Sequence, residues 1–241
     1  MLLRENFTLE HLESLQNAYP SVDKILLERT IYAFGLLEAL SKTGTPFIFK
    51  GGTCLMLLLK HPNRFSTDID IIVDPKCNIN EYLDKTAQSF PFLRFEEKVR
   101  KGVNNIEKKH FKFFYSALNS GREVGILLDV LFEENLYKQT IQKEIKNEFL
   151  LTSGIQTFVQ MPSIDSILGD KLTAFAPNST GIPYISINQE GVQTDKKMEV
   201  IKQFFDVATL FSEANNFDHI RNTYLEIVQS EINYRGLSIS Y

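Results

Sequence analysis

Two aspartates one residue apart, shortly after a Gly-Gly turn, restrict the fold of this chain more than any other feature. The turn, Lys50-Gly51-Gly52-Thr53, follows a short apolar run, and one short helix separates it from Asp68-Ile69-Asp70. Strand side chains repeat every two residues, so aspartates at this spacing in a strand point to one face. Such close like charges repel, and a divalent cation removes the penalty because hard cations take carboxylate oxygens as ligands. The pair therefore predicts a Mg²⁺ or Mn²⁺ site beside the turn.

The Gly51-Gly52-Thr53 turn lies where the apolar run 46–49 changes to a helical pattern. Two glycines let the backbone approach a ligand closely, and the start of the next helix presents free N–H groups and a positive dipole end. Phosphate oxygens suit such a place, although most Gly-Gly turns are only tight connections. The short distance to the aspartates favours the phosphate interpretation. Arg64 and Ser66 could hold the phosphates as well, the Arg through charge-assisted hydrogen bonds, or could belong to an ordinary surface loop.

Three further charged residues stand in or near apolar runs. Asp129 interrupts the run 126–132, which is typical of a strand buried on both faces. Because an unpaired buried charge is expensive, it is either paired with a local Lys or Arg, or is a third metal-binding carboxylate on an adjacent strand. We favour the second interpretation, since perturbed carboxylates gather at functional sites. Asp206 lies in the apolar run 204–211 and needs a partner if it is buried, for which Lys171 is a candidate.

The pattern along the chain predicts an α+β fold in two domains, residues 1–160 and 161–241. The first domain mixes helices over 22–42, 53–60 and 79–89 with strands over 46–49, 69–73 and 125–132 and a hairpin within 93–117. The second is helical over 163–175, 199–214 and 218–233, and the polar stretch 177–194 is expected to be a mobile insertion. Ser21, Asn78 and Ser163 are the expected N-caps. Such an arrangement favours a cleft between the two halves.

The charge balance excludes a broadly basic surface. A net charge of −4 gives no global attraction to nucleic acid or to anionic membranes, so a polyanionic substrate needs a local patch. One basic concentration is present, either as a solvated face or as a grip on a nucleic-acid backbone: Lys98, Arg100, Lys101, Lys108, Lys109, His110 and Lys112. The four histidines show no zinc spacing.

Cysteine content and hydropathy point to the cytoplasm. Cys54 and Cys77 are the two cysteines, too few for a disulfide framework. The N-terminus lacks the layout of a signal peptide, and no apolar run approaches the roughly 18 residues that a bilayer span requires. We therefore expect a soluble cytoplasmic protein with no membrane partner.

These motifs closely resemble those of the AbiEii/AbiGii-type toxin nucleotidyltransferases, within the DNA polymerase β-like nucleotidyltransferase superfamily. The likeness is carried by residues 49–55 and 64–71, and it continues more weakly at Asp129, around Lys171 in the segment 170–175, and in the segment 205–210. In the last segment Phe205 stands where the family has an Arg, and Thr209 where it has a second Asp.

The resemblance implies a nucleotidyltransferase-type mixed β-sheet with flanking helices and a metal-dependent transfer of NMP from an NTP to an acceptor hydroxyl. Asp68, Asp70 and Asp129 would be catalytic and bind Mg²⁺ or Mn²⁺, and Lys171 would be a catalytic lysine. The residues implied in nucleotide binding are Lys50, Gly51, Gly52, Thr53, Arg64, Ser66, Lys171 and Asp206.

The resemblance also implies an RNA acceptor, with the 3′ end of tRNA as the first candidate, and a toxin role opposed by a cognate antitoxin. Two alternatives stay open. One is a nucleotidyltransferase that modifies a protein or a small molecule. The other is a catalytically degenerate NTP-binding module, which the altered motif around Asp206 favours.

Overall fold

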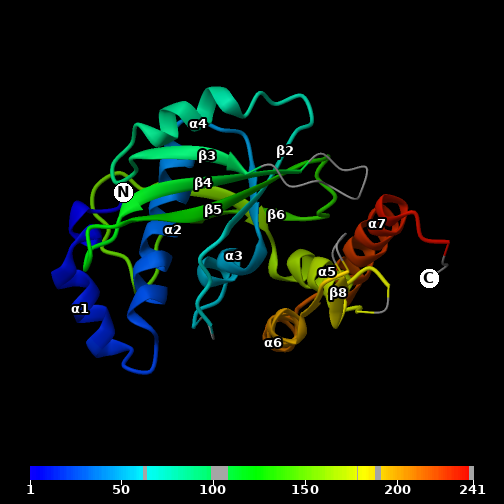
Figure 1. The fold of residues 1–241 in the computed structure, drawn as a ribbon. Helices are drawn as coiled ribbons and strands as arrows, with labels where there is room; N and C mark the ends of the chain where they lie inside the picture. Colours follow the sequence, from blue (N-terminus) through cyan, green and yellow to red (C-terminus); the bar gives the residue numbers. More distant parts are fainter. Residues whose placement is uncertain (62–63, 99–107, 178, 188–190, 239–241) are drawn as a thin grey trace. The chain divides into compact units, whose positions relative to one another are not determined.

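The structure is a computed structural model that describes residues 1–61, 64–98, 108–177, 179–187 and 191–238 (Figure 1). The chain forms two compact units. The first unit holds the described residues of 1–135 and 142–161. The second unit holds residues 136–141 and the described residues from 162 onward. We call them the sheet unit and the helical unit.

The sheet unit is built on a five-stranded mixed sheet in the order β1-β2-β5-β4-β3. The strands are β1 Ile48–Lys50, β2 Ile69–Val73, β3 Arg94–Lys98, β4 Lys108–Ser116 and β5 Glu123–Phe132. β2 and β5 run parallel, and the other neighbours run antiparallel. The predicted strands are thus present, including both arms of the hairpin, whose expected turn at 102–105 lies outside the described residues.

One face of the sheet forms the core of this unit. Alternate side chains on three neighbouring strands are almost fully buried, namely Ile69, Ile71, Phe111, Phe113, Leu128 and Val130. Helices α2 (Lys24–Lys42) and α4 (Asn80–Ala87) belong to this layer, α2 packing on β2 and β5 and α4 on β3 and α2. Each fully buried aliphatic or aromatic side chain contributes about 1.5–3 kcal/mol. Because strand side chains alternate, the positions between these residues belong to the opposite face, which we call the open face.

One of the three predicted helix N-caps is correct, and two are wrong. Ser163 is the N-cap of α5 (Ile164–Ala174), as predicted, and its hydroxyl accepts a hydrogen bond from the backbone N–H of Ser166. Ser21 was the wrong choice for α2, because Asp23 accepts from the N–H groups of the first turn instead. Asn78 is also not a cap. It lies before the N-cap residue of α4, and its amide donates to Glu81.

Several elements of the structure were not predicted. The N-terminal part holds the 3₁₀-helix η1 (Arg4–Phe7) and the helix α1 (Leu9–Ala18). Strands β6 (Thr140–Glu144) and β7 (Phe158–Pro162) form a separate two-stranded sheet. Helix α3 (Gly51–Leu58) starts at the first glycine of the turn, two residues earlier than expected.

The helical unit consists mainly of α5, α6 (Lys197–Ser212) and α7 (Phe217–Arg235), with α5 packed against both of the others. The described residues of the stretch expected to be a mobile insertion include regular strands, which corrects that prediction. It contains an antiparallel pair, β8 (Ile185–Ile187) and β9 (Gln193–Asp195), because Ile185 and Ile187 supply β-branched residues that the polar surroundings concealed.

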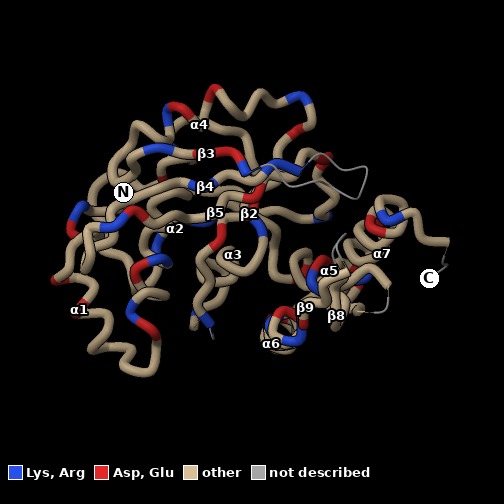
Figure 2. The backbone as a smooth tube through the Cα atoms, in the orientation of Figure 1, with Lys and Arg blue, Asp and Glu red and all other residues tan. Residues whose placement is uncertain are grey.

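Charge and hydropathy are distributed without extremes. Basic and acidic residues occur along both units rather than one sign dominating either of them (Figure 2). In the part of the chain that the structure describes, no helix combines the length and apolar character that crossing a membrane demands. The mixed sheet with its flanking helices confirms the predicted α+β class.

Candidate active site

A row of ionisable side chains crosses the open face of the sheet, one from each strand. The register pairs Lys50 with Asp70, and Asp70 with Asp129. It continues by pairing Asp129 with His110, and His110 with Lys98. Paired positions direct their side chains to the same face. The row therefore has two carboxylates near its middle and a lysine at each end.

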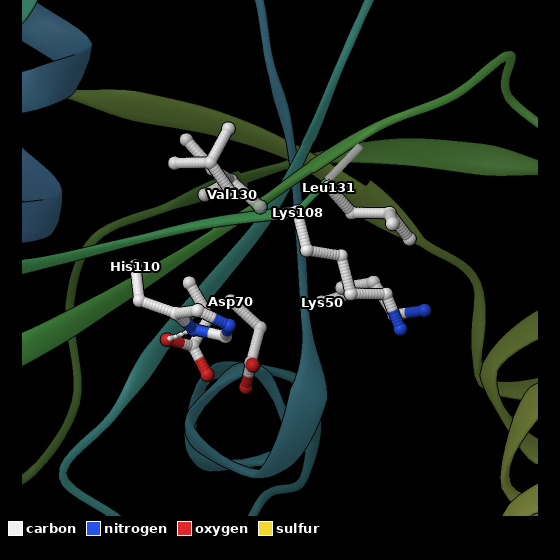
Figure 3. A pocket seen from close by; sticks show the side chains of 8 residues that line it. Lys50, Asp70, Lys108, His110, Val130 and Leu131 are labelled. Carbon is white, nitrogen blue, oxygen red and sulfur yellow. Dashed lines mark hydrogen bonds and ion pairs between the residues drawn. The ribbon is translucent and has the colours of Figure 1, made fainter. Parts of the chain in front are cut away.

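The middle of this row lines a pocket of about 220 Å³. Lys50, Asp70, His110 and Asp129 contribute to its wall, and Lys108 reaches it from the first position of β4 (Figure 3). The remaining lining residues are the apolar Ile71, Val130 and Leu131. The pocket thus combines two carboxylates, which attract cations, with two ammonium groups, which attract phosphates.

The turn from β1 into α3 is built against the carboxylate of Asp70. Gly51 has a φ of +81°, a conformation that side-chain-bearing residues rarely adopt. A Cβ atom on Gly51 would lie 2.0 Å from Oδ2 of Asp70, so the backbone passes directly beside this carboxylate. The Gly-Gly turn and the second aspartate, which are close in sequence, are therefore also in contact in space.

Arg64 and Ser66 lie over the second glycine. A Cβ atom on Gly52 would be 2.6 Å from Nη2 of Arg64 and 2.9 Å from Oγ of Ser66. The Thr53 hydroxyl donates to the backbone carbonyl of Asp68 at 2.6 Å, which ties α3 to the segment before β2. Helix N–H groups, a guanidinium and a hydroxyl meet here, which is the donor set of an anion site. We call Gly51, Gly52, Arg64 and Ser66 the cradle. Thr53 supports it from a fully buried position.

Asp129 has a partner that the sequence did not reveal. Nδ1 of His110 lies 2.7 Å from Oδ1 of Asp129. An ionised carboxylate only accepts hydrogen bonds, so the histidine N–H is the donor. Among the described residues, the hydrogen-bond partner of Asp129 is therefore His110, and not the Lys or Arg of the alternative interpretation. The prediction that the Asp129 strand adjoins the Asp70 strand is confirmed.

The register explains why His110 was missed. In β4 the buried positions Phe111, Phe113 and Tyr115 alternate with the open-face positions, to which His110 belongs. Its alternation was visible in the sequence, but the residue opposite it depends on how β4 aligns with β5. Arg100 and Lys101 of the basic concentration lie outside the described residues.

The predicted set of three metal ligands is only partly assembled. Asp70 and Asp129 are register neighbours, whereas Asp68 is exposed and lies one residue before β2. Within the described ranges, no three His, Cys, Asp or Glu side chains are arranged to hold a metal ion. Mg²⁺, however, is commonly bound by one or two protein carboxylates together with substrate phosphates and water. Asp70 and Asp129 suit a cation of this kind, whose other ligands would be substrate phosphates and water.

Lys171 and Asp206 lie in the helical unit and pair with each other. Nζ of Lys171 on α5 is 3.0 Å from Oδ2 of Asp206 on α6, and only 9% and 1% of the two side chains are exposed. Lys171 also donates to Oε1 of Gln203 at 3.1 Å. The pairing predicted from their apolar surroundings is confirmed. All other predicted site residues lie in the sheet unit.

A comparison with known protein families shows which family this chain belongs to. Residues 35–237 match the family described as the nucleotidyl transferase AbiEii toxin of type IV toxin–antitoxin systems. The chain belongs to the AbiEii family. Membership makes it a toxin-type nucleotidyltransferase and implies an antitoxin as its functional partner. The family resemblance predicted from the two motifs is thereby confirmed.

Two solved structures are similar to this chain. An antigenic nucleotidyltransferase-like protein from Paracoccidioides brasiliensis is similar with a TM-score of 0.50 and 15% identity, over 84% of this chain and 88% of that one. A candidate nucleotidyltransferase from H. pylori gives a TM-score of 0.41 and 13% identity, over 85% of this chain and 95% of that one. The first likeness supports the nucleotidyltransferase fold. A comparison with curated protein sequences finds no significant match.

Proposed function

We propose that this AbiEii-family protein transfers a nucleoside monophosphate from an NTP to an acceptor hydroxyl in a reaction that depends on Mg²⁺ or Mn²⁺. The observation that carries the proposal is the contact between the backbone of Gly51 and the carboxylate of Asp70. Through this contact an anion-binding helix start and a cation-binding carboxylate share one small region. A nucleoside triphosphate with its cation needs both.

The cradle would bind the phosphates of the donor. The first N–H groups of α3, the guanidinium of Arg64 and the hydroxyl of Ser66 all donate hydrogen bonds, and anions are favoured at a helix N-terminus. Lys50 on β1 lines the adjacent pocket and adds an ammonium group. Lys171 and Asp206 enter the proposal through the family resemblance. Lys171 donates to Asp206 and to Gln203, so the pair and the glutamine hold the ammonium group in place.

The carboxylates would hold the cation. Asp70 and Asp129 are its proposed ligands, with Asp68 as the third. When bound, a divalent cation offsets the phosphate charge and lowers the pKa of a hydroxyl that it contacts. Both carboxylates line the same pocket of about 220 Å³, in which phosphate oxygens would complete the cation's ligands.

In the proposed transfer, the acceptor oxygen forms a bond with the α-phosphorus of the NTP. The bond between the α-phosphorus and the oxygen that bridges the α- and β-phosphates breaks. Pyrophosphate leaves with that electron pair. The proton of the acceptor hydroxyl passes to the carboxylate of Asp129, which acts as general base. The products are the acceptor bearing an NMP, and pyrophosphate.

The acceptor we propose is RNA in the cytoplasm, with the 3′ end of tRNA first. The family resemblance supports it, and so do three lysines at open-face positions of β3 and β4, namely Lys98, Lys108 and Lys112. They could neutralise phosphates of an RNA backbone on the same face as Asp129. The toxin role would follow from blocking that RNA end.

A labelling experiment tests the proposal. The protein is incubated with each α-labelled NTP, Mg²⁺ and total RNA, protein extract or metabolites, beside an Asp68→Ala/Asp70→Ala variant. As a matched control, Asp218→Ala removes an exposed aspartate of α7. We expect label in RNA with the wild type and the control, and none with the double variant.

Each other outcome is informative. Label that survives the double substitution would overturn the carboxylate assignment. Label in protein or in a small molecule would replace RNA as the acceptor. Metal-dependent NTP binding with no product in any mixture would favour the degenerate module, in line with Phe205 in place of the family's Arg.

A further inference from the structure

We propose that His110 is a positioning residue that fixes the orientation of the Asp129 carboxylate for nucleotide transfer. By holding Oδ1, it would leave Oδ2 available to the proposed cation and to the acceptor hydroxyl. This inference rests on the proposed function, because Asp129 has these tasks only if the chain transfers nucleotides. It adds a residue to the site that neither the sequence motifs nor the family description assigns.

The geometry supports a defined hydrogen bond rather than a chance contact. The distance of 2.7 Å between Nδ1 of His110 and Oδ1 of Asp129 lies at the short end for an N–H donor and a carboxylate. The two residues are register partners on hydrogen-bonded strands, so the β-ladder fixes the separation of their backbones. The imidazole is the less exposed partner, with 15% of its side chain exposed against 34% for Asp129. A constrained ring therefore holds a carboxylate that solvent and substrate can still reach.

The residue type suits this task. An imidazole can donate the hydrogen bond while it is neutral, so it orients the carboxylate without cancelling its charge. A lysine at position 110 would place a permanent positive charge against Asp129 and compete with the metal cation. Lysines stand at neighbouring open-face positions instead, on β3 and two residues away along β4, at Lys98, Lys108 and Lys112.

The two carboxylates of the row are thus oriented by different means. Asp70 is confined by the backbone of Gly51, which passes beside its Oδ2. Asp129 is held instead by a side chain from the next strand, since its hydrogen-bond partner among the described residues of the pocket is His110. Groups that hydrogen-bond to ligating residues typically change metal affinity or activity by about 10- to 100-fold when removed.

The test compares His110→Ala, which removes the donor, with His110→Asn, whose amide N–H can occupy the place of Nδ1–H. His219→Ala on α7 is the matched control, because it removes a histidine outside the sheet unit. Mn²⁺ affinity is measured by electron paramagnetic resonance in the presence of a non-hydrolysable NTP. The kcat and the KM for NTP are measured with the acceptor that the labelling experiment identifies. Thermal unfolding sets a temperature at which all variants are folded.

We expect His110→Ala to weaken Mn²⁺ binding by about 10- to 100-fold and to lower kcat, with little change in the KM for NTP, because the cradle is intact. His110→Asn should recover much of the Mn²⁺ affinity, and His219→Ala should match the wild type. Equal Mn²⁺ affinity in His110→Ala and the wild type would overturn the role of His110 but not the proposed function. The same holds if His110→Asn binds Mn²⁺ no more tightly than His110→Ala. A wild type that neither binds Mn²⁺ nor transfers nucleotide would overturn the proposed function, and this inference with it.

Discussion

In the sheet unit, charged side chains form an open row that lines a pocket, whereas in the helical unit Lys171 and Asp206 face each other in an almost closed interior. The row sets Asp70 beside Asp129, an arrangement of like charges that costs stability in the absence of a cation. The helical pair combines opposite charges, which are tolerated when buried only because each satisfies the other. Both regions show an aspartate in an apolar run. What distinguishes them is exposure, because the Asp206 side chain is closed off with Lys171 whereas Asp70 and Asp129 line a pocket.

The largest expected effect is on catalysis in the row. Asp70→Asn should lower kcat/KM for transfer by about 1,000-fold, equivalent to about 4 kcal/mol, because a metal ligand is lost. The free energy of unfolding should change little, since the repulsion from Asp129 and the attraction to Lys50 are lost together. Parallel measurements of nucleotide transfer and urea unfolding check this. A large loss of stability would make Asp70 a structural residue like Asp206.

The buried pair should show the reverse behaviour. Asp206→Leu should reduce the free energy of unfolding by about 3–5 kcal/mol, because it leaves the ammonium of Lys171 buried and unpaired. The double variant Lys171→Met/Asp206→Leu should recover most of that loss. Urea unfolding of the wild type, both single variants and the double variant measures the coupling. Additive losses in the double variant would show that the two side chains do not act as a pair.

A substitution of Gly51, which lies beside Asp70, should have a smaller effect than the changes above. Gly51→Ala should destabilise by about 1–2 kcal/mol because φ is positive, and it should also reduce activity because the new methyl group displaces the Asp70 carboxylate. Gly44→Ala is the matched control, with a φ of +77° and no atom within 4 Å of the added Cβ. It should show a similar loss in thermal unfolding with full activity. Equal activity in the two variants would contradict the close approach at Gly51.

The smallest effect is expected at an exposed pair on the sheet. Arg94 donates hydrogen bonds to Glu123, and they hold the pKa of that carboxyl below its ordinary value of 4.5. A lowered folded-state pKa stabilises the protein above pH 4.5, and the contribution is lost as the pH falls through the lowered value. Glu123→Gln should therefore be slightly less stable than the wild type at pH 7. The difference should vanish in acid, as unfolding curves across pH will show.

Local patterns predicted the parts of the site that are close in sequence. The strand, Gly-Gly turn, helix and second strand lie within residues 48–73, and their spacing alone placed Asp70 near the turn. The near-continuous apolar run around Asp129 was enough to expect a neighbouring strand. For Lys171 and Asp206, the cost of burying an unpaired charge predicted the partner across many residues.

Long-range alignment could not be predicted in the same way. His110 meets Asp129 only because of the register between β4 and β5, and a shift by one residue would exchange it for the buried face. The short strands β6 and β7 carry no strong alternation, so they were missed. The caps at Asp23 and near Ile79 differ from the predicted ones by a residue or two, since several nearby polar side chains compete for the same N–H groups.

The row across the open face draws one residue from each of five strands, which has a consequence for how the protein is made. Strand β5, which carries Asp129 and lies between β2 and β4, is synthesised after the cradle, Asp68, Asp70 and β3. A nascent or truncated chain that ends before β5 contains the residues of the cradle but not the complete row. A misaligned sheet likewise turns one member to the wrong side. The proposed transfer therefore requires a chain that has been synthesised at least to the end of β5 and whose strands are paired in register.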